Sequence, residues 1–323
     1  MRKVLAGLIA AAMLAVAGLA PATAQEAYPT RPVKIIIAFP VGGLLDTVSR
    51  VVGEKLSNLL GQQFVIEARP GAGGTIATQA VARADPDGYT LMMINDNHAL
   101  NPSVFKNITY DSVKDFAPIG FVGSTPLVYL ANPKFAPNDL KQVVALAKEK
   151  PGTITYASVG IGSASHLAGE IFASAADIKL QHIPYRGGAP ALNDLVAGHV
   201  DTQFMSPVIG LPHLQAGKLK GLAIAADKRL PLLKDLPTMA EAGYPVEAGY
   251  WFGLVAPAAT PPAIVAKLEK ALADALADEQ VKQRLTEMGA VVTPLNSKQF
   301  GDYIKAEITK WAEVITKNNV KIE

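Results

Sequence analysis

The chain has 323 residues, with 30 lysines and arginines against 28 aspartates and glutamates, and it contains no cysteine. Without cysteine it can form neither disulfides nor thiolate metal sites, and it cannot carry a lipoprotein anchor. A nearly neutral chain without basic runs is not typical of nucleic-acid-binding proteins, so nucleic acid is not an expected partner. A mature chain of about 300 residues exceeds a comfortable single core, and we therefore expect two lobes.

The N-terminus has the pattern of a secretory signal peptide. Arg2 and Lys3 precede an apolar run from Val4 to Ala20, and Ala22-Thr23-Ala24 forms an A-x-A cleavage site. We therefore expect residues 1–24 to be removed on export, and a retained single membrane anchor is the alternative. Removal takes away two basic residues and leaves 28 basic residues against 28 acidic ones.

Beyond this segment, strand-like apolar runs alternate with helical periodicity, which predicts an α/β protein with mostly parallel sheets. In chain order we expect strands at residues 33–39, 64–67, 90–95, 121–131, 153–158, 180–184, 202–205, 221–225 and 250–257. We expect helices at residues 47–60, 77–84, 139–150, 166–176 and 189–197, then two long helices with apolar stripes from Ile264 to Leu276 and from Phe300 to Ile315. No strand separates these last two helices. We therefore expect them to pack on the first lobe and to make it discontinuous.

The first strand breaks into its helix at Pro40-Val41-Gly42-Gly43. Glycines allow the main chain to approach a ligand closely, and a helix start presents unpaired N–H groups at the positive end of the helix dipole. Such a terminus binds carboxylate or phosphate without a charged side chain. A tight structural turn is the alternative. Asp46 either complements the helix dipole or recognises a donor on the ligand, whereas Leu44 and Leu45 leave ligand binding to the backbone.

A second turn of this kind lies at Gly160-Ile161-Gly162-Ser163-Ala164-Ser165. It nearly matches a dinucleotide fingerprint, but the acidic residue expected about twenty positions later is missing, so a nucleotide site is not expected. We predict an anion site in which the Ser163 and Ser165 hydroxyls lie beside helix N–H groups, and a plain helix N-cap is the alternative for either serine. For His166, a neutral packed or hinge-facing histidine is favoured over a catalytic one.

A third turn, Tyr185-Arg186-Gly187-Gly188, also follows a short strand and precedes a helix. Its two glycines open a helix start, and the Arg186 guanidinium offers a planar fork for a carboxylate. A surface arginine beside a turn is the alternative. We assign Trp251 and Phe252 to the core or hinge, with ligand stacking as the less favoured role.

Linear motifs for catalysis and metal binding are absent from the sequence. There is no G-x-S-x-G elbow and no cysteine nucleophile, and the five histidines have neither metal-ligand spacing nor an H-E-x-x-H motif. We therefore expect no catalytic residues, no metal and no cofactor. A secreted hydrolase stays open as an alternative, because catalytic triads assemble in space.

A series of further motifs spans the mature chain in order. The motifs are Tyr28-Pro29-x-Arg31-Pro32-Val33, Phe39-Pro40-Val41-Gly42-Gly43-x-x-Asp46 with Arg50, Arg69-Pro70-Gly71-Ala72-Gly73-Gly74, Asp87-Gly88-Tyr89-Thr90-Leu91, Tyr156-Ala157-Ser158, Gly162-Ser163-x-x-His166-Leu167-Ala168-Gly169-Glu170, His182-x-Pro184-Tyr185-Arg186-Gly187-Gly188, Leu236-Pro237-Thr238, Glu241-x-Gly243-Tyr244 and Trp251-x-Gly253. Together they resemble one family, the periplasmic substrate-binding proteins of tripartite tricarboxylate transporters, also called the Bug or TctC family.

The resemblance implies a two-lobed periplasmic-binding-protein fold, a type II Venus flytrap with two crossover connections. We place lobe 1 at residues 25–126 with 250–323, and lobe 2 at residues 127–249. The implied protein is periplasmic and monomeric, and it delivers a small organic carboxylate to the membrane subunits of a secondary transporter. A receptor for a carboxylate-sensing signalling system is a further alternative. The predicted ligand-binding residues are Phe39, Gly42, Gly43, Leu44, Asp46, Gly162, Ser163, His166, Tyr185, Arg186, Gly187 and Gly188.

Two features depart from the family pattern. Leu44-Leu45 begins at a position that is often small or polar in this family, and Ala68 stands before Arg69 where asparagine is common. The leucines make the cleft mouth more apolar, and Ala68 removes a polar anchor. We therefore hypothesise a ligand with a carboxylate and a comparatively apolar body, such as an aromatic or medium-chain acid.

Overall fold

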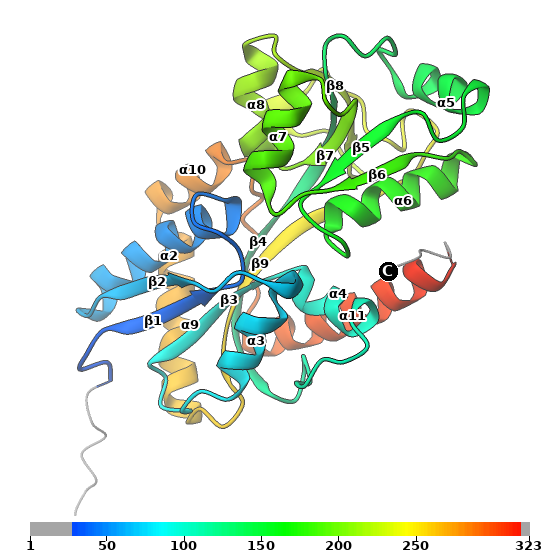
Figure 1. The fold of residues 1–323 in the computed structure, drawn as a ribbon. Coiled ribbons are helices and arrows are strands. Elements are labelled where there is room, and N and C mark those ends of the chain that lie inside the picture. The colour runs from blue at the N-terminus through cyan, green and yellow to red at the C-terminus, as the bar shows by residue number, and fades with distance from the viewer. Residues whose placement is uncertain (1–27, 318–323) are drawn as a thin grey trace, which may run out of the picture. The chain divides into compact units, whose positions relative to one another are not determined.

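The computed structural model describes residues 28–317, so the signal peptide predicted at residues 1–24 lies outside the described residues. From Arg31 onward the strands form two groups, which are joined by the long strand β4 (Phe116–Ala131) (Figure 1). The path of neighbouring strands is β2-β1-β3-β9-β4-β7-β5-β6, with β8 paired to β4.

The first group begins with three parallel strands. These are β1 (Val33–Ile37), β2 (Phe64–Ala68) and β3 (Thr90–Asn95), with β1 between the other two. Strand β9 (Gly249–Pro257) runs antiparallel to β3, and the first part of β4 runs antiparallel to β9. The chain between the parallel strands forms α2 (Leu44–Leu60), the short helix η1 (Ala72–Gly74) and α3 (Thr75–Ala82).

The second group repeats this plan around the other end of β4. Its strands are β5 (Thr155–Ser158), β6 (Gln181–Pro184), β7 (Thr202–Met205) and β8 (Lys220–Ala225). Strand β5 pairs in parallel with β6 and β7, whereas β7 and β8 pair antiparallel with β4. The connecting helices are α5 (Leu140–Glu149), α6 (Ala164–Ala176), α7 (Gly188–Ala197), α8 (Pro207–Gln215) and the short η2 (Pro231–Leu233).

The chain crosses between the two groups through β4 and β9. Strand β4 pairs with β9 as far as Pro126, which lies opposite Gly249. From there on it pairs with β8, beginning at Leu127, and with β7, beginning at Val128. These are the two crossover connections of the periplasmic-binding-protein fold. The prediction of mostly parallel sheets is wrong for this region, because the outgoing and returning strands lie side by side in opposite directions.

Three helices were not predicted. Helix α4 (Asn97–Val104) contains Pro102, and α8 contains Pro212, so both sequences carry a residue that normally interrupts helices. Helix α10 (Glu279–Glu287) is separate from the long helix before it because Asp278 ends that helix and caps the next one, accepting hydrogen bonds from two of its N–H groups.

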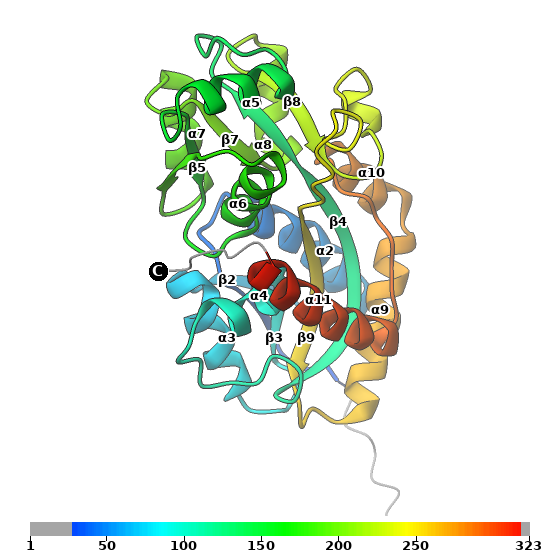
Figure 2. The same ribbon diagram turned by 90° about the vertical axis from the view of Figure 1, so that its right-hand side faces the viewer.

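The C-terminal helices pack mainly on the first group. Helix α9 (Pro262–Ala277) contacts β4 and α2, and α11 (Ser297–Lys317) contacts β4 and α4 (Figure 2). Near the end of α11, the buried Trp311 donates a hydrogen bond from Nε1 to Glu307 at 3.0 Å and packs with Leu100 and Leu167. No helix between residues 28 and 317 combines the length and the apolar character needed to cross a membrane.

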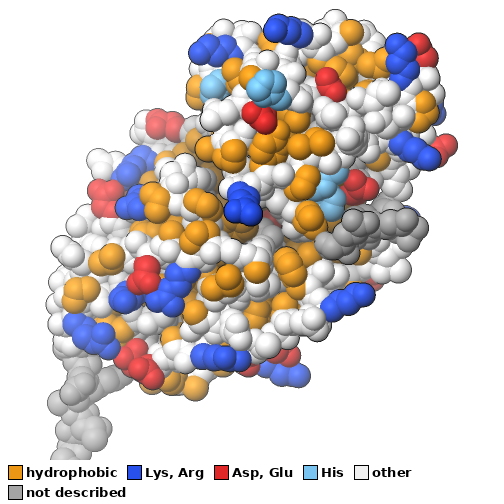
Figure 3. Space-filling view, viewed as in Figure 1, with side chains coloured by type: hydrophobic (Ala, Val, Ile, Leu, Met, Phe, Trp, Pro, Cys, Tyr) orange, Lys and Arg blue, Asp and Glu red, His pale blue; other side chains and the backbone are white. Residues whose placement is uncertain are grey.

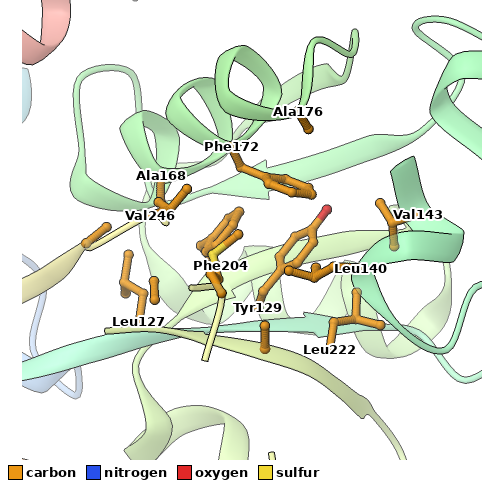
Figure 4. Close-up of a cluster of buried hydrophobic side chains, with 14 of the residues drawn as sticks. Leu127, Tyr129, Leu140, Val143, Ala168, Phe172, Ala176, Phe204, Leu222 and Val246 are labelled. Carbon is orange, nitrogen blue, oxygen red and sulfur yellow. The ribbon is translucent and has the colours of Figure 1, made fainter. Parts of the chain in front are cut away.

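Aromatic packing holds the second group together. Tyr129 on β4 stacks on Phe204 of β7, with ring centroids 4.2 Å apart, and meets Phe172 of α6 edge-on (Figure 4). The buried Tyr129 hydroxyl donates to the Thr202 hydroxyl at 3.1 Å, so the polar end of the ring is satisfied. This core fixes β7 against β4 and thereby positions the residues that follow β7.

Candidate functional site

A cavity of about 410 Å³ opens at the carboxyl ends of parallel strands from both groups. Ligands of open α/β sheets bind at such strand ends. Hydrophobic side chains gather across the middle of the face seen in Figure 3, between the two groups of strands. The cavity is lined by residues 39–45, Asn95, Asn97, Val159, residues 186–190, Leu192, Gln203, Met205, Ser206, Ile209, Tyr250 and Phe252.

The turn between β1 and α2 forms one wall of the cavity. Gly42 has a φ of +84°, a left-handed conformation that favours glycine, and Gly43 is the N-cap of α2. Because Gly43 has no side chain, no side-chain hydrogen bond caps this helix start. The Leu44 and Leu45 side chains are buried beside the turn. The wall therefore combines backbone N–H groups with apolar side chains.

Asp46 supports this turn from behind the cavity wall. Its carboxylate accepts hydrogen bonds from the Gly42 N–H and from Arg50 Nε, both at 3.0 Å. Burial alone would raise the pKa of Asp46, but the hydrogen bonds from Arg50 and Gly42 hold the pKa below its ordinary value. Asp46 does not line the cavity. Its observed contacts hold the glycine turn and complement the start of α2.

The turn between β6 and α7 contributes the cation of the cavity. Arg186 is exposed and lines the cavity, and it forms no ion pair with any residue between 28 and 317. Gly187 has a φ of +114°, and a Cβ at this position would lie 4.0 Å from the Pro40 side chain. The turns after β1 and β6 are therefore close neighbours, and they bring Arg186 near the start of α2.

Tyr185, which precedes Arg186, does not line the cavity. Its hydroxyl donates a hydrogen bond to the Asp194 carboxylate at 2.6 Å, within α7. Partial burial and the neighbouring Asp194 carboxylate raise the pKa of Tyr185 to about 12. In this structure Tyr185 secures the turn to its own helix.

The turn between β5 and α6 is covered by the first group and contributes only Val159 to the cavity lining. A Cβ on Gly162 would overlap the Val104 side chain at the end of α4. The Ser163 hydroxyl donates to the Gly160 carbonyl at 2.6 Å and accepts a weak hydrogen bond from the His166 N–H at 3.4 Å. These are the contacts of a helix N-cap.

His166 is buried within this turn. Its Nδ1 accepts a hydrogen bond from the Gly162 N–H at 3.1 Å, and its ring stacks on His182 with centroids 4.0 Å apart. Burial lowers the pKa of both histidines to about 4, so both are neutral at pH 7. Neither lines the cavity.

The structure thus divides the predicted site residues into two sets. Those that line the cavity together are Phe39, Gly42, Gly43, Leu44, Arg186, Gly187 and Gly188. Those outside the lining are Asp46, Gly162, Ser163, His166 and Tyr185.

Sequence reasoning missed four polar residues that lie within or just after β3 and β7. Asn95, Asn97, Gln203 and Ser206 are buried and line the cavity. The sequence signal that could have identified them is a polar residue within or just after a buried apolar strand, because a buried polar group there needs a hydrogen-bond partner. Phe252 lines the cavity. Trp251, its neighbour in β9, packs in the core among Phe121, Phe300 and Tyr303.

The described residues contain one close serine–histidine pair that bears on the hydrolase alternative. The Ser158 hydroxyl lies 2.6 Å from His182 Nε2, but Ser158 is fully buried and does not line the cavity. A substrate in the cavity would not meet this serine. Among residues 28–317 no cluster of histidine, aspartate and glutamate has the arrangement of a metal site.

Comparison with known proteins gives a consistent family. The model of the tripartite tricarboxylate transporter family receptor matches residues 48–320. The chain is 35% identical to the protein BugT of Bordetella pertussis, over 313 residues that cover 96% of each chain.

Solved structures agree over the same length. The chain is 39% identical to the periplasmic binding protein BugD, with a TM-score of 0.85, and the match covers 91% of this chain and 99% of that one. An R. palustris protein with adipate is 32% identical, with a TM-score of 0.87, over 90% of this chain and 98% of that one. MatC from Rhodopseudomonas palustris with bound malate is 35% identical, with a TM-score of 0.82, over 89% and 100% of the two chains.

Proposed function

The chain belongs to the tripartite tricarboxylate transporter receptor family, and we propose that it captures a small organic carboxylate and delivers it to the membrane subunits of a secondary transporter. Members of this family bind solutes and are not enzymes, which confirms the prediction that the chain is not an enzyme. The predicted signal peptide supports export to the periplasm, and we propose that the protein acts there as a monomer.

The observation that carries this proposal is the pairing of two anion-binding features on one cavity. The start of α2 has no side-chain cap, and the Arg186 guanidinium has no ion-pair partner among residues 28–317. A helix start and an arginine fork both favour a carboxylate. The adjacent turns after β1 and β6 bring the two features together.

We propose direct ligand contact for the predicted residues that line the cavity. Asp46 would then act by holding the Gly42 turn, and Tyr185 by holding Arg186 and its glycines. The turn around Ser163 would act as packing between the two groups of strands. This assignment separates residues that should alter affinity from residues that should alter stability.

We also propose that the two groups of strands are lobes that close around the ligand, with boundaries at residues 126/127 and 249/250. The change of partner along β4 supports this division, because the pairing with β9 ends where Pro126 meets Gly249. Closure would exclude water from the cavity and strengthen each hydrogen bond to the ligand.

The ligand body should be comparatively apolar. Leu44, Leu45, Leu192 and Ile209 line the cavity, and they offer the body of the ligand hydrocarbon rather than hydrogen-bonding groups. We therefore keep a medium-chain or aromatic acid as the proposed ligand. Adipate in the R. palustris structure supports a chain of methylene groups, whereas malate in MatC is shorter and more polar.

Binding can be tested with the mature protein, residues 25–323. Thermal-shift screening against mono- and dicarboxylates of varied chain length should find acids that raise the melting temperature, and calorimetry should give their affinities. Arg186→Gln should weaken binding by about 1–3 kcal/mol, because a charge-assisted hydrogen bond is lost. The control is Arg83→Gln, since Arg83 is exposed and lies outside the cavity lining. Equal losses in both variants, or no binding of any acid, would contradict the proposal.

Delivery needs its own experiment. Uptake of the bound acid by cells that contain the membrane subunits should depend on this protein, and Arg186→Gln should reduce uptake at low acid concentration. Uptake that is independent of the protein would contradict delivery while leaving solute binding intact.

A further inference from the structure

Two buried polar atoms of residues that line the cavity lack a hydrogen-bond partner among residues 28–317. They are Oε1 of Gln203 and the hydroxyl of Ser206, and each residue is only 1% exposed and lines the cavity. Native proteins leave few buried polar groups unpaired, because an unpaired group loses its hydrogen bonds to water without replacement. A group on the ligand can supply the missing partner.

The Ser206 hydroxyl is free at a position where the chain would ordinarily use it. Ser206 is the N-cap residue of α8, but its side chain makes no cap hydrogen bond. By contrast Ser163 and Asp139, the N-caps of α6 and α5, each accept a hydrogen bond from an N–H of their helix. The start of α8 therefore does not use the Ser206 hydroxyl.

Gln203 is directed to the cavity by the alternation of side chains along β7. Thr202 and Phe204 face the core, where they contact Tyr129. Gln203 and Met205 consequently lie on the opposite face of the strand, and both line the cavity. The core packing of β7 thus fixes the face of the strand from which the Gln203 side chain projects.

Exposure and charge differ between two parts of the cavity lining. We call the exposed residues Val41, Gly42 and Arg186 the rim, and the buried residues Gln203 and Ser206 the floor. Arg186 is the one charged residue in the cavity lining as described, and it belongs to the rim. A carboxylate on the floor would be buried without a cation, which is costly, whereas an uncharged polar group avoids this cost.

We propose that Gln203 and Ser206 form a specificity subsite for an uncharged hydrogen-bonding group, such as a hydroxyl, carried at the end of the ligand opposite to its carboxylate. This inference rests on the proposed function, because the carboxylate at the rim sets the orientation of the ligand. The ligand is then a monoanionic acid with an apolar middle and a neutral polar end.

Three sets of straight-chain acids that differ only at the far end provide the test. Calorimetry on mature wild-type protein would compare unsubstituted monocarboxylates, their ω-hydroxy derivatives and the α,ω-dicarboxylates, with chains of about four to eight carbons to span the cavity. At the best length, the ω-hydroxy acid should bind about tenfold more tightly than the monocarboxylate and than the dicarboxylate. The monocarboxylate leaves the floor without a partner, and the dicarboxylate buries a second charge there without a cation.

Variants of the floor should remove this discrimination. Ser206→Ala and Gln203→Leu should each reduce the preference for the hydroxy acid over the monocarboxylate several-fold. They should not lower the melting temperature of the ligand-free protein, because neither atom has a partner to lose. The matched control is Ser112→Ala, since Ser112 is a buried serine outside the cavity whose hydroxyl donates to the His98 carbonyl at 2.9 Å. This variant should keep the wild-type preference.

The outcomes separate this inference from the proposed function. If no acid binds, the proposed function fails and the inference fails with it. If acids bind and Arg186→Gln weakens them, but the hydroxyl gives no gain or the floor variants keep the preference, only the subsite is overturned. A dicarboxylate that binds as tightly as the hydroxy acid overturns the neutral character of the floor.

Discussion

Acid should destabilise the protein through its buried histidines, and His166 shows how large the effect is. Burial lowers the pKa of His166 from 6.5 to about 4, so the unfolded chain takes up a proton at a higher pH than the folded one. The contribution of neutral His166 to the free energy of unfolding is therefore present above pH 6.5, and it is lost as the pH falls from 6.5 to about 4. His166 should contribute a loss of about 2 kcal/mol at pH 5 and about 3 kcal/mol below pH 4.

A structural reason accompanies this loss. His166 Nδ1 accepts the Gly162 N–H, and a protonated imidazole can no longer accept it. His98 and His182 have pKa values lowered to about 4 by burial as well, so they should add to the same transition.

The assay is urea unfolding at pH 7 and pH 5, for wild type and His166→Gln. Glutamine has no titratable proton, and its amide oxygen can replace the acceptor, so the loss between the two pH values should shrink by about 2 kcal/mol. His199→Gln, at an exposed histidine on the surface, is the control and should change the loss by less than about 0.5 kcal/mol. An acid loss that is the same in His166→Gln and wild type would refute the reasoning.

Three further substitutions address the turns and the last helix. Gly162→Ala should lower the free energy of unfolding in urea by about 1–3 kcal/mol, because Gly162 has a φ of +74° and a Cβ would overlap Val104. Unchanged stability would contradict the packing of the β5–α6 turn. Asp46→Asn should cost about 1–3 kcal/mol by weakening the charged hydrogen bond from Gly42, and the melting temperature should show it even without ligand. Trp311→Ala should lower the free energy of unfolding by about 3–5 kcal/mol by opening a cavity under α11. Increased proteolysis of α11 would show the same change. A wild-type melting temperature would contradict the packing of α11 through Trp311.

Much of the fold was predictable because its signals are local. The glycines after β1 and β6 mark strand-to-helix turns by their backbone freedom, and the stripes of α9 and α11 mark their buried faces. The antiparallel pairing of β4 with β9 was not predictable in this way. Its two strands lie more than a hundred residues apart, and neither strand's pattern specifies the direction of its partner.

In the candidate site too, features that depend on neighbouring residues were predictable, and features that depend on distant segments were not. The Pro40–Gly43 and Arg186–Gly188 turns could be recognised as anion-binding helix starts from their own residues. The Gly162–Ser163 turn has the same local pattern, but Val104 covers it, and only packing between distant helices reveals this.

By itself the sequence determined the strands, most of the helices, the positions of the glycine turns, the family and the absence of thiol chemistry, because each depends on residues that are neighbours in the chain. The tertiary structure decided which turns share one cavity and which polar side chains remain unpaired within it. Gln203 and Ser206 belong to that second class. Whether a buried amide or hydroxyl is satisfied depends on every atom packed around it, and those atoms come from segments that only folding brings together.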